Sequence, residues 1–339
     1  MNRGRALLQY SLTRLALAPL MLWLIASMVF LLLRIAPGDP VDAVLGNRAS
    51  EAARVALRAK LGLNQPIFQQ YLEFIRDLSH GDLGEALVNQ EPVRTIIQKA
   101  LPATLELGIS ALIIAILIGL TVGFSGIARK EGKVDLAGRI FGIATYALPP
   151  FWAAMLVQLL FAVVLGWLPV GGRFPPSLLQ PEGSGFLLFD SFATGNWIAL
   201  KGSIRHLLLP SMTLGILLSG IFSRALRINL TRILESNHIE AARSRGLKEH
   251  QIVFRHALPN ALLPVLTIAG ITVASLIGGA LLIEVTFSWP GIAMKLQEAI
   301  NQRDYPVVQG IVVVIAGLAV LISVLVDLII ASIDPRVRY

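Results

Sequence analysis

The chain has 339 residues, of which 55% are hydrophobic and only 15% are charged. A soluble domain averages about 45–50% apolar and about 25% charged residues, so this composition excludes a disordered chain, a coiled coil and an ordinary cytosolic enzyme. The absence of Cys excludes a disulfide framework, an iron–sulfur cluster, a thiolate zinc site and a catalytic thiol. The formal net charge of +8 would fit a nucleic-acid partner, but the charges lie between long apolar blocks. The sequence therefore predicts an integral membrane protein.

Six apolar stretches are long enough, or nearly so, to cross a membrane as helices. A helix that crosses the ~30 Å hydrocarbon core needs about 20 mostly apolar residues. The stretches are residues 15–33, 104–124, 140–166, 206–222, 261–283 and 308–330. We therefore predict an all-α polytopic membrane protein with six transmembrane helices.

Three of these spans have features that affect how they cross. The first is longer than the about 7–15 residues of a signal-peptide core and no small-x-small cleavage site follows it, so we expect a retained span. The third is too long for a straight crossing and contains Pro149 and Pro150, which predicts a kinked or tilted helix. The fourth is the shortest and contains Pro210, so it is the weakest of the six.

Lys and Arg are distributed unevenly between the two sides of the membrane. Segments 1–14, 125–139, 223–260 and 331–339 hold more than twice as many basic as acidic residues. Segments 34–103, 167–205 and 284–307, on the other side, hold equal numbers. Because basic residues favour the cytoplasmic side, we predict that both chain termini are cytoplasmic. The basic charge then needs no nucleic acid to explain it.

The loop from residue 34 to residue 103 is large enough to fold on the outer side. It opens with Pro-Gly-Asp-Pro at 37–40, which we expect to stop the first helix. One short helix is predicted between Ser50 and Gly62, and another from Pro66 onwards. The second helix places apolar residues on one face, namely Phe68, Tyr71, Leu72, Ile75 and Leu78. These helices lie on the outer surface of the bundle or form a small soluble cap, and the sequence leaves both readings open.

The sequence carries no constellation for catalysis or metal binding. It has no G-x4-GK[ST] loop, so the chain is not expected to hydrolyse ATP, and the five His residues lack metal-ligand spacing. Glu106 and Asp327 lie inside predicted spans but within about 5 Å of an interface, which favours packing or capping over proton transport. Glycine pairs at helical spacing predict close helix packing within this chain or with a partner chain. These are Gly119 with Gly123, Gly138 with Gly142, and Gly270 with Ala274 and Gly278.

The segment from residue 231 to residue 259 precedes the fifth span. Its sequence predicts a helix, a turn and a second short helix that a proline ends. We expect Glu240, Ala241 and Ala242 to close a helix that begins near Thr231. Gly246 stands where a helix end favours a left-handed residue. A second short helix should run to Ala257, and Pro259 should end it. Two alanines beside a tight turn form a low surface that suits the groove of another protein.

This segment also resembles a known motif. The pattern E-A-A-x3-G, followed by H-x-L-P, is similar to the coupling motif of binding-protein-dependent ATP-binding-cassette (ABC) importers. The matching residues are Glu240, Ala241, Ala242, Gly246, His256, Leu258 and Pro259. A second Glu-Ala-Ala at 51–53 has neither the glycine nor the following H-x-L-P, so the extended motif carries the resemblance and the tripeptide does not.

Further segments look like the dipeptide/oligopeptide/nickel importer family, and more narrowly like its B-type permease subunit. They are APGDP (36–40), HGDLG (80–84), LPATLELG (101–108), LPPFW (148–152), FSWPG (287–291) and RDYPVVQG (303–310). The resemblance implies a type I permease in a bacterial inner membrane. Residues 1–103 would form an N-terminal helix with its outer loop, and residues 98–330 the importer transmembrane domain.

The resemblance also implies partners and a function. A second, homologous permease subunit, two cytoplasmic ATPase subunits and an extracytoplasmic solute-binding protein would complete the importer. ATP and Mg would bind the ATPase subunits, with no cofactor on this chain. The expected role is a non-enzymatic permease for dipeptides or oligopeptides, with nickel or glutathione as alternative substrates. An ion-coupled secondary transporter is the alternative from another class, and it would show mid-membrane ion sites or inverted repeats, neither of which is evident.

Overall fold

The computed structural model describes residues 3–35, 41, 45, 50–128 and 132–333. Over this part the chain is helical, and its β-structure is one bridge between Glu85 and Pro92. The helices are α1 (Arg3–Ile35), α3 (Glu51–Lys60), α4 (Ile67–Ser79), α5 (Val93–Ala128), α6 (Lys133–Ala147), α7 (Pro150–Gln158), η1 (Leu159–Val164), α8 (Leu187–Ala193), α9 (Trp197–Leu234), α10 (Asn237–Ser244), α11 (Glu249–Gln251), η2 (Ile252–Ala257), α12 (Leu258–Gly279), α13 (Leu281–Thr286), α14 (Ile292–Gln302) and α15 (Tyr305–Ile333).

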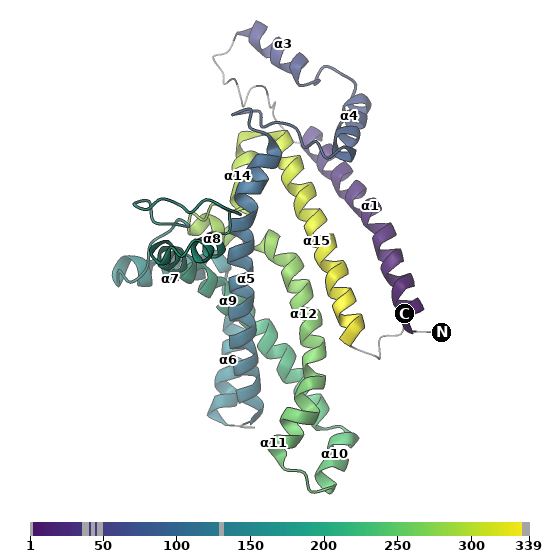
Figure 1. Ribbon diagram of the computed structural model, residues 1–339, viewed down its shortest axis with the longest axis vertical. Helices are drawn as coiled ribbons and strands as arrows, with labels where there is room; N and C mark the ends of the chain where they lie inside the picture. The colour runs from purple at the N-terminus through teal and green to yellow at the C-terminus, as the bar shows by residue number, and fades with distance from the viewer. Residues whose placement is uncertain (1–2, 36–40, 42–44, 46–49, 129–131, 334–339) are drawn as a thin grey trace.

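The helices form an elongated bundle with different small helices at its two ends. Helices α3 and α4 lie at one end of the long axis, and α10 and α11 lie at the other (Figure 1). The first residues of α1 and the last residues of α15 both point toward the end that carries α10. We call the end with α3 and α4 the outer end and the end with α10 the inner end. This arrangement agrees with the predicted alternation of the loops between two sides.

Five helices of the described residues are long and apolar enough to cross a membrane, or six if one bent pair counts as a single span. The six predicted stretches overlap these elements, which confirms the all-α polytopic fold. The fourth stretch, predicted as the weakest, is the centre of the 38-residue helix α9. This helix runs through Pro210 and buries 61% of its most apolar window, more than any other span. The fifth predicted stretch is divided, because α12 ends at Gly279 and α13 follows.

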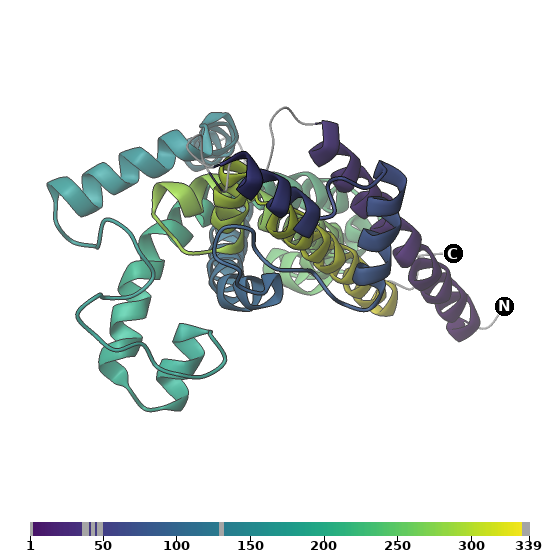
Figure 2. The same ribbon diagram turned by 90° about the horizontal axis from the view of Figure 1, so that it is seen from above.

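The bent pair is the third predicted span, and it is broken rather than kinked. Helix α6 ends at Ala147, α7 begins at Pro150, and their axes differ by 104°. The reason is local, since Pro149 and Pro150 lack the N–H groups that would continue the helix, and Leu148 and Pro149 are extended. Helix α7 therefore leaves the side of the bundle (Figure 2).

The centre of the bundle is the contact between α5 and α9, and glycines make it close. A Cβ on Gly119 would lie 2.6 Å from the carbonyl oxygen of Ser219, and one on Gly123 would lie 2.8 Å from that of Ser223. These two glycines therefore serve packing within this chain. Gly270 likewise lies against Val326 of α15. The side chains of Ala274, Gly278 and Asp327 lie outside the described residues.

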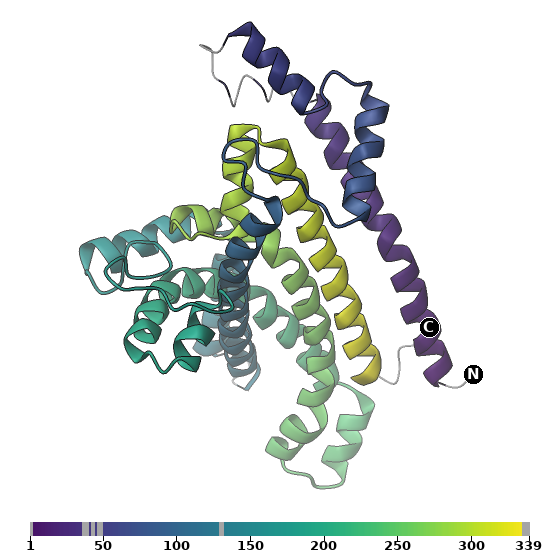
Figure 3. The ribbon, with the colours of Figure 1, turned by 45° about the horizontal axis from the view of Figure 1, so that its top comes forward.

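Helix α1 lies on the outside of α15 and carries α4 beside its outer end (Figure 3). The ring of Phe30 in α1 lies 5.4 Å from that of Tyr71 and 5.5 Å from that of Phe74, both in α4. Both predicted loop helices are present, and α3 begins after Ser50, whose hydroxyl accepts the Ala53 N–H at 3.3 Å. Helix α4 therefore packs on a spanning helix instead of forming a separate cap. The predicted stop at residues 37–40 lies outside the described residues.

Candidate coupling segment and outer pocket

The inner end carries the segment that resembles the coupling motif. Helix α9 ends at Leu234 and α10 begins after Ser236, so the predicted single helix from Thr231 to Ala242 is wrong. Ser236 is extended, with ψ 151°, and its hydroxyl lies beside the carbonyl oxygen of Ile233. Ser favours such a break because its side chain competes with the backbone for hydrogen bonds. Helix α10 is consequently a separate element below the bundle (Figure 1).

Gly246 ends α10 in the predicted left-handed conformation. Its φ is +80°, and no atom lies within 4 Å of the position that a Cβ would occupy. The Gly246 N–H donates to the carbonyl oxygen of Arg243 at 2.9 Å, and the Leu247 N–H donates to that of Ala242 at 3.4 Å. Glycine is needed here for its backbone conformation alone, because space is not limiting.

The two alanines of the motif differ in burial. Ala242 is buried together with Ile239 in an apolar cluster that also contains Leu230 of α9, Ile252 of η2 and Ala261 of α12. Glu240 and Ala241 are exposed. The expected surface of two alanines is therefore half correct, since one anchors α10 to the bundle and the other faces away from it.

Pro259 does not end a helix. Helix α11, the π-helical turn η2 and α12 follow one another without a break, and Pro259 lies in the first turn of α12. The Leu258 N–H donates to the carbonyl oxygen of Val253, five residues back, which is the π-helical spacing. The wider turn accommodates a proline ring that an α-helical turn would exclude. His256 lies within η2 and is half-buried, and its carbonyl oxygen accepts from the Asn260 amide at 2.8 Å.

An exposed ion pair closes the turn at the inner end. Arg243 Nε donates to Glu249 Oε1 at 2.7 Å, and the two side chains are 45% and 65% exposed. This hydrogen bond holds the pKa of the Glu249 carboxyl below its usual range. The pair connects α10 to α11 across Gly246, and Arg243 Nη1 also donates to the carbonyl oxygen of Leu234, the last residue of α9, at 3.5 Å.

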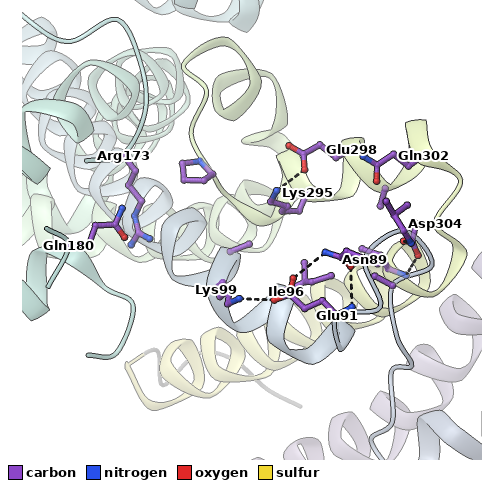
Figure 4. A pocket seen from close by; sticks show the side chains of 16 residues that line it. Asn89, Glu91, Ile96, Lys99, Arg173, Gln180, Lys295, Glu298, Gln302 and Asp304 are labelled. Atoms are coloured by element: carbon purple, nitrogen blue, oxygen red, sulfur yellow. Dashed lines mark hydrogen bonds and ion pairs between the residues drawn. The ribbon is translucent and has the colours of Figure 1, made fainter. Parts of the chain in front are cut away.

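The outer end contains a pocket of about 550 Å³ between the start of α5 and α14 (Figure 4). On the α5 side, Lys99 Nζ donates to Glu91 Oε1 at 2.7 Å. On the α14 side, Lys295 Nζ donates to Glu298 Oε2 at 2.7 Å. Three amide side chains complete the polar lining, namely Asn89, Gln180 and Gln302. These residues come from separate segments and form no motif, so the sequence alone did not indicate the pocket.

Two charged groups at this pocket are held by the fold itself. Arg173 donates to Glu106 at 2.5 Å and to the carbonyl oxygen of Gly185 at 2.7 Å, and both side chains of the ion pair are buried. Glu106 also accepts the Leu188 N–H at 2.9 Å. Glu106 therefore fastens the segment between η1 and α9 to α5, which fits the packing role expected from its position in the sequence.

Asp304 is the second such group. It accepts the N–H groups of Leu87 at 2.8 Å and Val307 at 3.4 Å, so it joins the loop before α5 to the start of α15. Burial raises the pKa of the Asp304 carboxyl, against the opposing effect of these backbone hydrogen bonds. The aspartate of the segment RDYPVVQG is thus a structural residue.

A buried hydrogen-bond network lies beneath the pocket and joins two of the family-like segments. Thr104 Oγ1 donates to Glu284 at 2.5 Å and accepts the Ile292 N–H at 2.8 Å. Glu284 is fully buried and also accepts the Met294 N–H at 2.9 Å, while Trp289 Nε1 donates to the carbonyl oxygen of Ala103 at 2.8 Å. These contacts explain Thr104 of LPATLELG and Trp289 of FSWPG as ties between α5 and the chain around the start of α14. No group of His, Asp and Glu suited to a metal ion occurs among the described residues.

A second cavity, of about 680 Å³, opens between α6, α9 and α12 nearer the inner end. Its lining is mostly apolar, with Thr145 and Tyr146 on α6. Among the described residues that line it, Arg224 of α9 is the one with a charged side chain. Tyr146 is 82% exposed, so the side of the bundle formed by α6 is open in the isolated chain.

Comparison with known proteins places the chain in a family. A model described as "Binding-protein-dependent transport system inner membrane component" matches residues 111–339, and the model of the N-terminal part of such components matches residues 7–108. The dipeptide transport system permease protein DppB of Alkalihalophilus pseudofirmus is 38% identical over 98% of this chain and 100% of that protein. The di/tripeptide permease DppB of Pseudomonas aeruginosa is 37% identical over 92% and 93%, and DppB of Escherichia coli K12 is 35% identical over 98% and 99%.

A solved structure supports the same fold. An inward-facing structure of the MetNI methionine ABC transporter has a chain that aligns with a TM-score of 0.54 and 18% identity. The alignment covers 71% of this chain and 97% of that one. The chain therefore belongs to the family of binding-protein-dependent transport system inner membrane components, the permease subunits of ABC importers.

Proposed function

We propose that this chain forms half of the translocation pathway of an ATP-driven importer of small peptides. The relatives whose names specify dipeptides or di/tripeptides match this chain over nearly their full length, which supports a peptide substrate over nickel or glutathione. A second, homologous permease subunit would cover the open side at α6. A solute-binding protein would deliver the peptide to the outer end, and two ATPase subunits would bind ATP and Mg at the inner end.

The observation that carries this proposal is the way α10 is attached. Ile239 and Ala242 bury one face of α10 against the ends of α9 and α12, while Glu240 and Ala241 remain exposed beside the turn at Gly246. A partner protein that binds the exposed face of α10 and then moves must displace the whole helix, including its buried face. Movement of an ATPase subunit would thus also displace α9 and α12, two spanning helices that line the cavity of about 680 Å³. His256 and Pro259 belong to η2 and the first turn of α12, through which the displacement would pass.

The orientation of the chain is part of the proposal. The excess of Lys and Arg in the loops at the inner end supports a cytoplasmic location for α10 and for both termini, in the bacterial inner membrane. A single cysteine at Ser79 should react with an impermeant maleimide in intact cells, and one at Ser236 should not. The reverse pattern would reject both the orientation and the coupling role.

Reconstitution tests the energy source. The chain should be placed in proteoliposomes together with its permease, ATPase and solute-binding partners, and the uptake of a labelled dipeptide should be measured. We expect uptake that requires ATP and continues when the proton gradient is dissipated. The chain alone should neither bind ATP specifically nor transport. Uptake by the chain alone, driven by an ion gradient, would reject the proposal in favour of a secondary transporter.

A further inference from the structure

The outer pocket presents both signs of charge on each of two facing walls. Glu91 and Lys99 lie on the wall formed by the start of α5, and Lys295 and Glu298 lie on the wall formed by α14 (Figure 4). The two walls are near enough to interact, because Lys99 chiefly and Lys295 to a smaller extent hold the pKa of the Glu91 carboxyl below its usual range. The pocket therefore offers alternating positive and negative groups within one small volume.

These four charges differ from the other charged groups of the pocket in how firmly they are held. Arg173 is 10% exposed and is fixed by its ion pair with buried Glu106. The carboxylate of Asp304 already accepts hydrogen bonds from backbone N–H groups. By contrast, Lys99 is 72% exposed, Lys295 and Glu298 are 40% and 39% exposed, and Glu91 is 28% exposed. Exposed ion pairs contribute little to folding stability, so a ligand with its own charges can exchange with them at small cost. The exchangeable charges are Glu91, Lys99, Lys295 and Glu298.

The size and the remaining lining indicate the kind of ligand. A volume of about 550 Å³ falls within the range of about 300–1,000 Å³ that is typical of small-molecule sites. Amide side chains at Asn89, Gln180 and Gln302 match the donors and acceptors of a peptide bond. No aromatic side chain is found among the described lining residues, so a planar ring would gain no stacking. A simple anion or cation would meet as many repelling as attracting charges.

We propose that the outer pocket is a receiving site for a small zwitterionic peptide, in which Lys99 and Lys295 contact its carboxylate and Glu91 and Glu298 contact its ammonium group. The identity of the ligand as a peptide rests on the proposed function. The site would hold the peptide between its release from the solute-binding protein and its entry into the pathway.

Protection of a cysteine tests this directly. Gln302 is exposed and lines the pocket, and the chain has no native cysteine, so Gln302→Cys gives one reporter in the assembled transporter. The rate of maleimide labelling of this chain should be measured with dialanine and with N-acetyl dialanine amide, which has no charged ends. At ten times the dissociation constant, dialanine should slow labelling about tenfold, and the neutral analogue should have no effect.

Variants that each remove one charge then identify which side chains contact the peptide. Glu91→Gln or Lys295→Gln in the reporter background should raise the half-protecting dialanine concentration by about fivefold, which is the upper end for one exposed charge pair. Glu85→Gln is the matched control, because Glu85 is an exposed carboxylate near Glu91 that does not line the pocket. A reporter at Ser79, away from the pocket, should label at the same rate with and without peptide.

The outcomes separate this inference from the proposed function. Labelling requires no ATP and no transport, so protection by dialanine without uptake would reject the transport proposal and leave the site. Normal uptake without protection would overturn the site alone. Equal protection by the neutral analogue would also overturn it, as would protection by the solute-binding protein in place of dialanine, because the pocket would then be a protein-docking surface.

Discussion

The two ends of the molecule each contain an Arg–Glu pair, and the pairs differ in their surroundings. At the outer end, Arg173 and Glu106 are 10% and 7% exposed and share further hydrogen bonds with the backbone of the segment before α9. At the inner end, Arg243 and Glu249 are 45% and 65% exposed and span a turn that faces solvent. The chemistry of the two pairs is the same, so burial and the added backbone hydrogen bonds decide which one holds the fold together.

The same contrast extends to the elements around each pair. The outer end is fastened by buried polar contacts, such as Glu284 with Thr104 and Asp304 with Leu87. At the inner end, α10 is fastened by apolar contacts of Ile239 and Ala242, and its ion pair between Arg243 and Glu249 is exposed. Apolar contacts without directional hydrogen bonds allow small displacements, whereas buried hydrogen bonds oppose them. This difference suits a rigid outer end and a movable α10 at the inner end.

The largest difference in stability between the two ends is expected when the arginine of each pair is removed. Arg173→Ala leaves Glu106 buried without its partner, which costs about 3–5 kcal/mol. Arg243→Ala, its matched control, removes an exposed pair and should cost about 0–1 kcal/mol. The thermal unfolding midpoint of the purified chain in detergent measures both. Equal losses in the two variants would show that burial does not distinguish the pairs.

The two alanines of the coupling segment provide the next comparison. Ala242→Leu forces a larger side chain into the cluster around Ile252 and should destabilise the chain by about 1–3 kcal/mol. Ala241→Leu adds the same atoms on the exposed face and should leave the unfolding midpoint unchanged while it weakens association with the ATPase subunits. The measurements are thermal unfolding and co-purification of those subunits. If Ala241→Leu left association intact and Ala242→Leu left stability intact, the assignment of the two faces would be wrong.

Gly246→Val tests the turn itself. A residue other than glycine held at positive φ costs about 1–2 kcal/mol, and a β-branched residue costs more, so the turn should distort while the bundle remains folded. We expect loss of ATPase association and of uptake at normal expression, and a weaker effect for Gly246→Ala.

Gly195→Val is the matched control for this prediction. Gly195 lies between α8 and α9 at φ +66°, is exposed, and also has no atom within 4 Å of a Cβ position. The backbone strain is therefore the same, but the site is far from α10, and ATPase association should be normal. If both variants behaved alike, the effect of Gly246→Val would be general strain, and the segment would be an ordinary linker.

The sequence predicted the fold where local chemistry decides it and failed where packing decides it. Pro149 and Pro150 predicted a kinked or tilted third span, and they break it locally, whereas the sequence did not indicate that the 104° turn brings α7 against α9 and α13. Helix α9 was predicted as short because its polar outer turns, which include Lys201 and Arg205, resemble a loop by hydropathy. They remain helical because they continue a helix that is already formed and buried at its centre.

The candidate sites also include features that local chemistry determines and features that depend on packing. Gly246 was predictable because a left-handed helix end favours glycine whatever lies around it. The different burial of Ala241 and Ala242 was not, since it depends on the break at Ser236 that sets the direction of α10. The outer pocket could not be predicted at all, because it joins charges that are far apart in the sequence and carry no local pattern.

The smallest expected effect concerns the pH dependence of the inner pair. The hydrogen bond from Arg243 lowers the pKa of Glu249 below its ordinary value of 4.5, so the pair contributes stability above that pH and loses it as the pH falls through the lower folded value. The effect is small because both side chains are exposed. A double-mutant cycle of Arg243→Gln and Glu249→Gln, followed by thermal unfolding, isolates the coupling between the two residues. This coupling should be constant between pH 7 and about pH 5 and should vanish in stronger acid. Coupling that persisted after Glu249 was protonated would mean that the pair acts through a neutral hydrogen bond, and the charge-based account of the turn would fail.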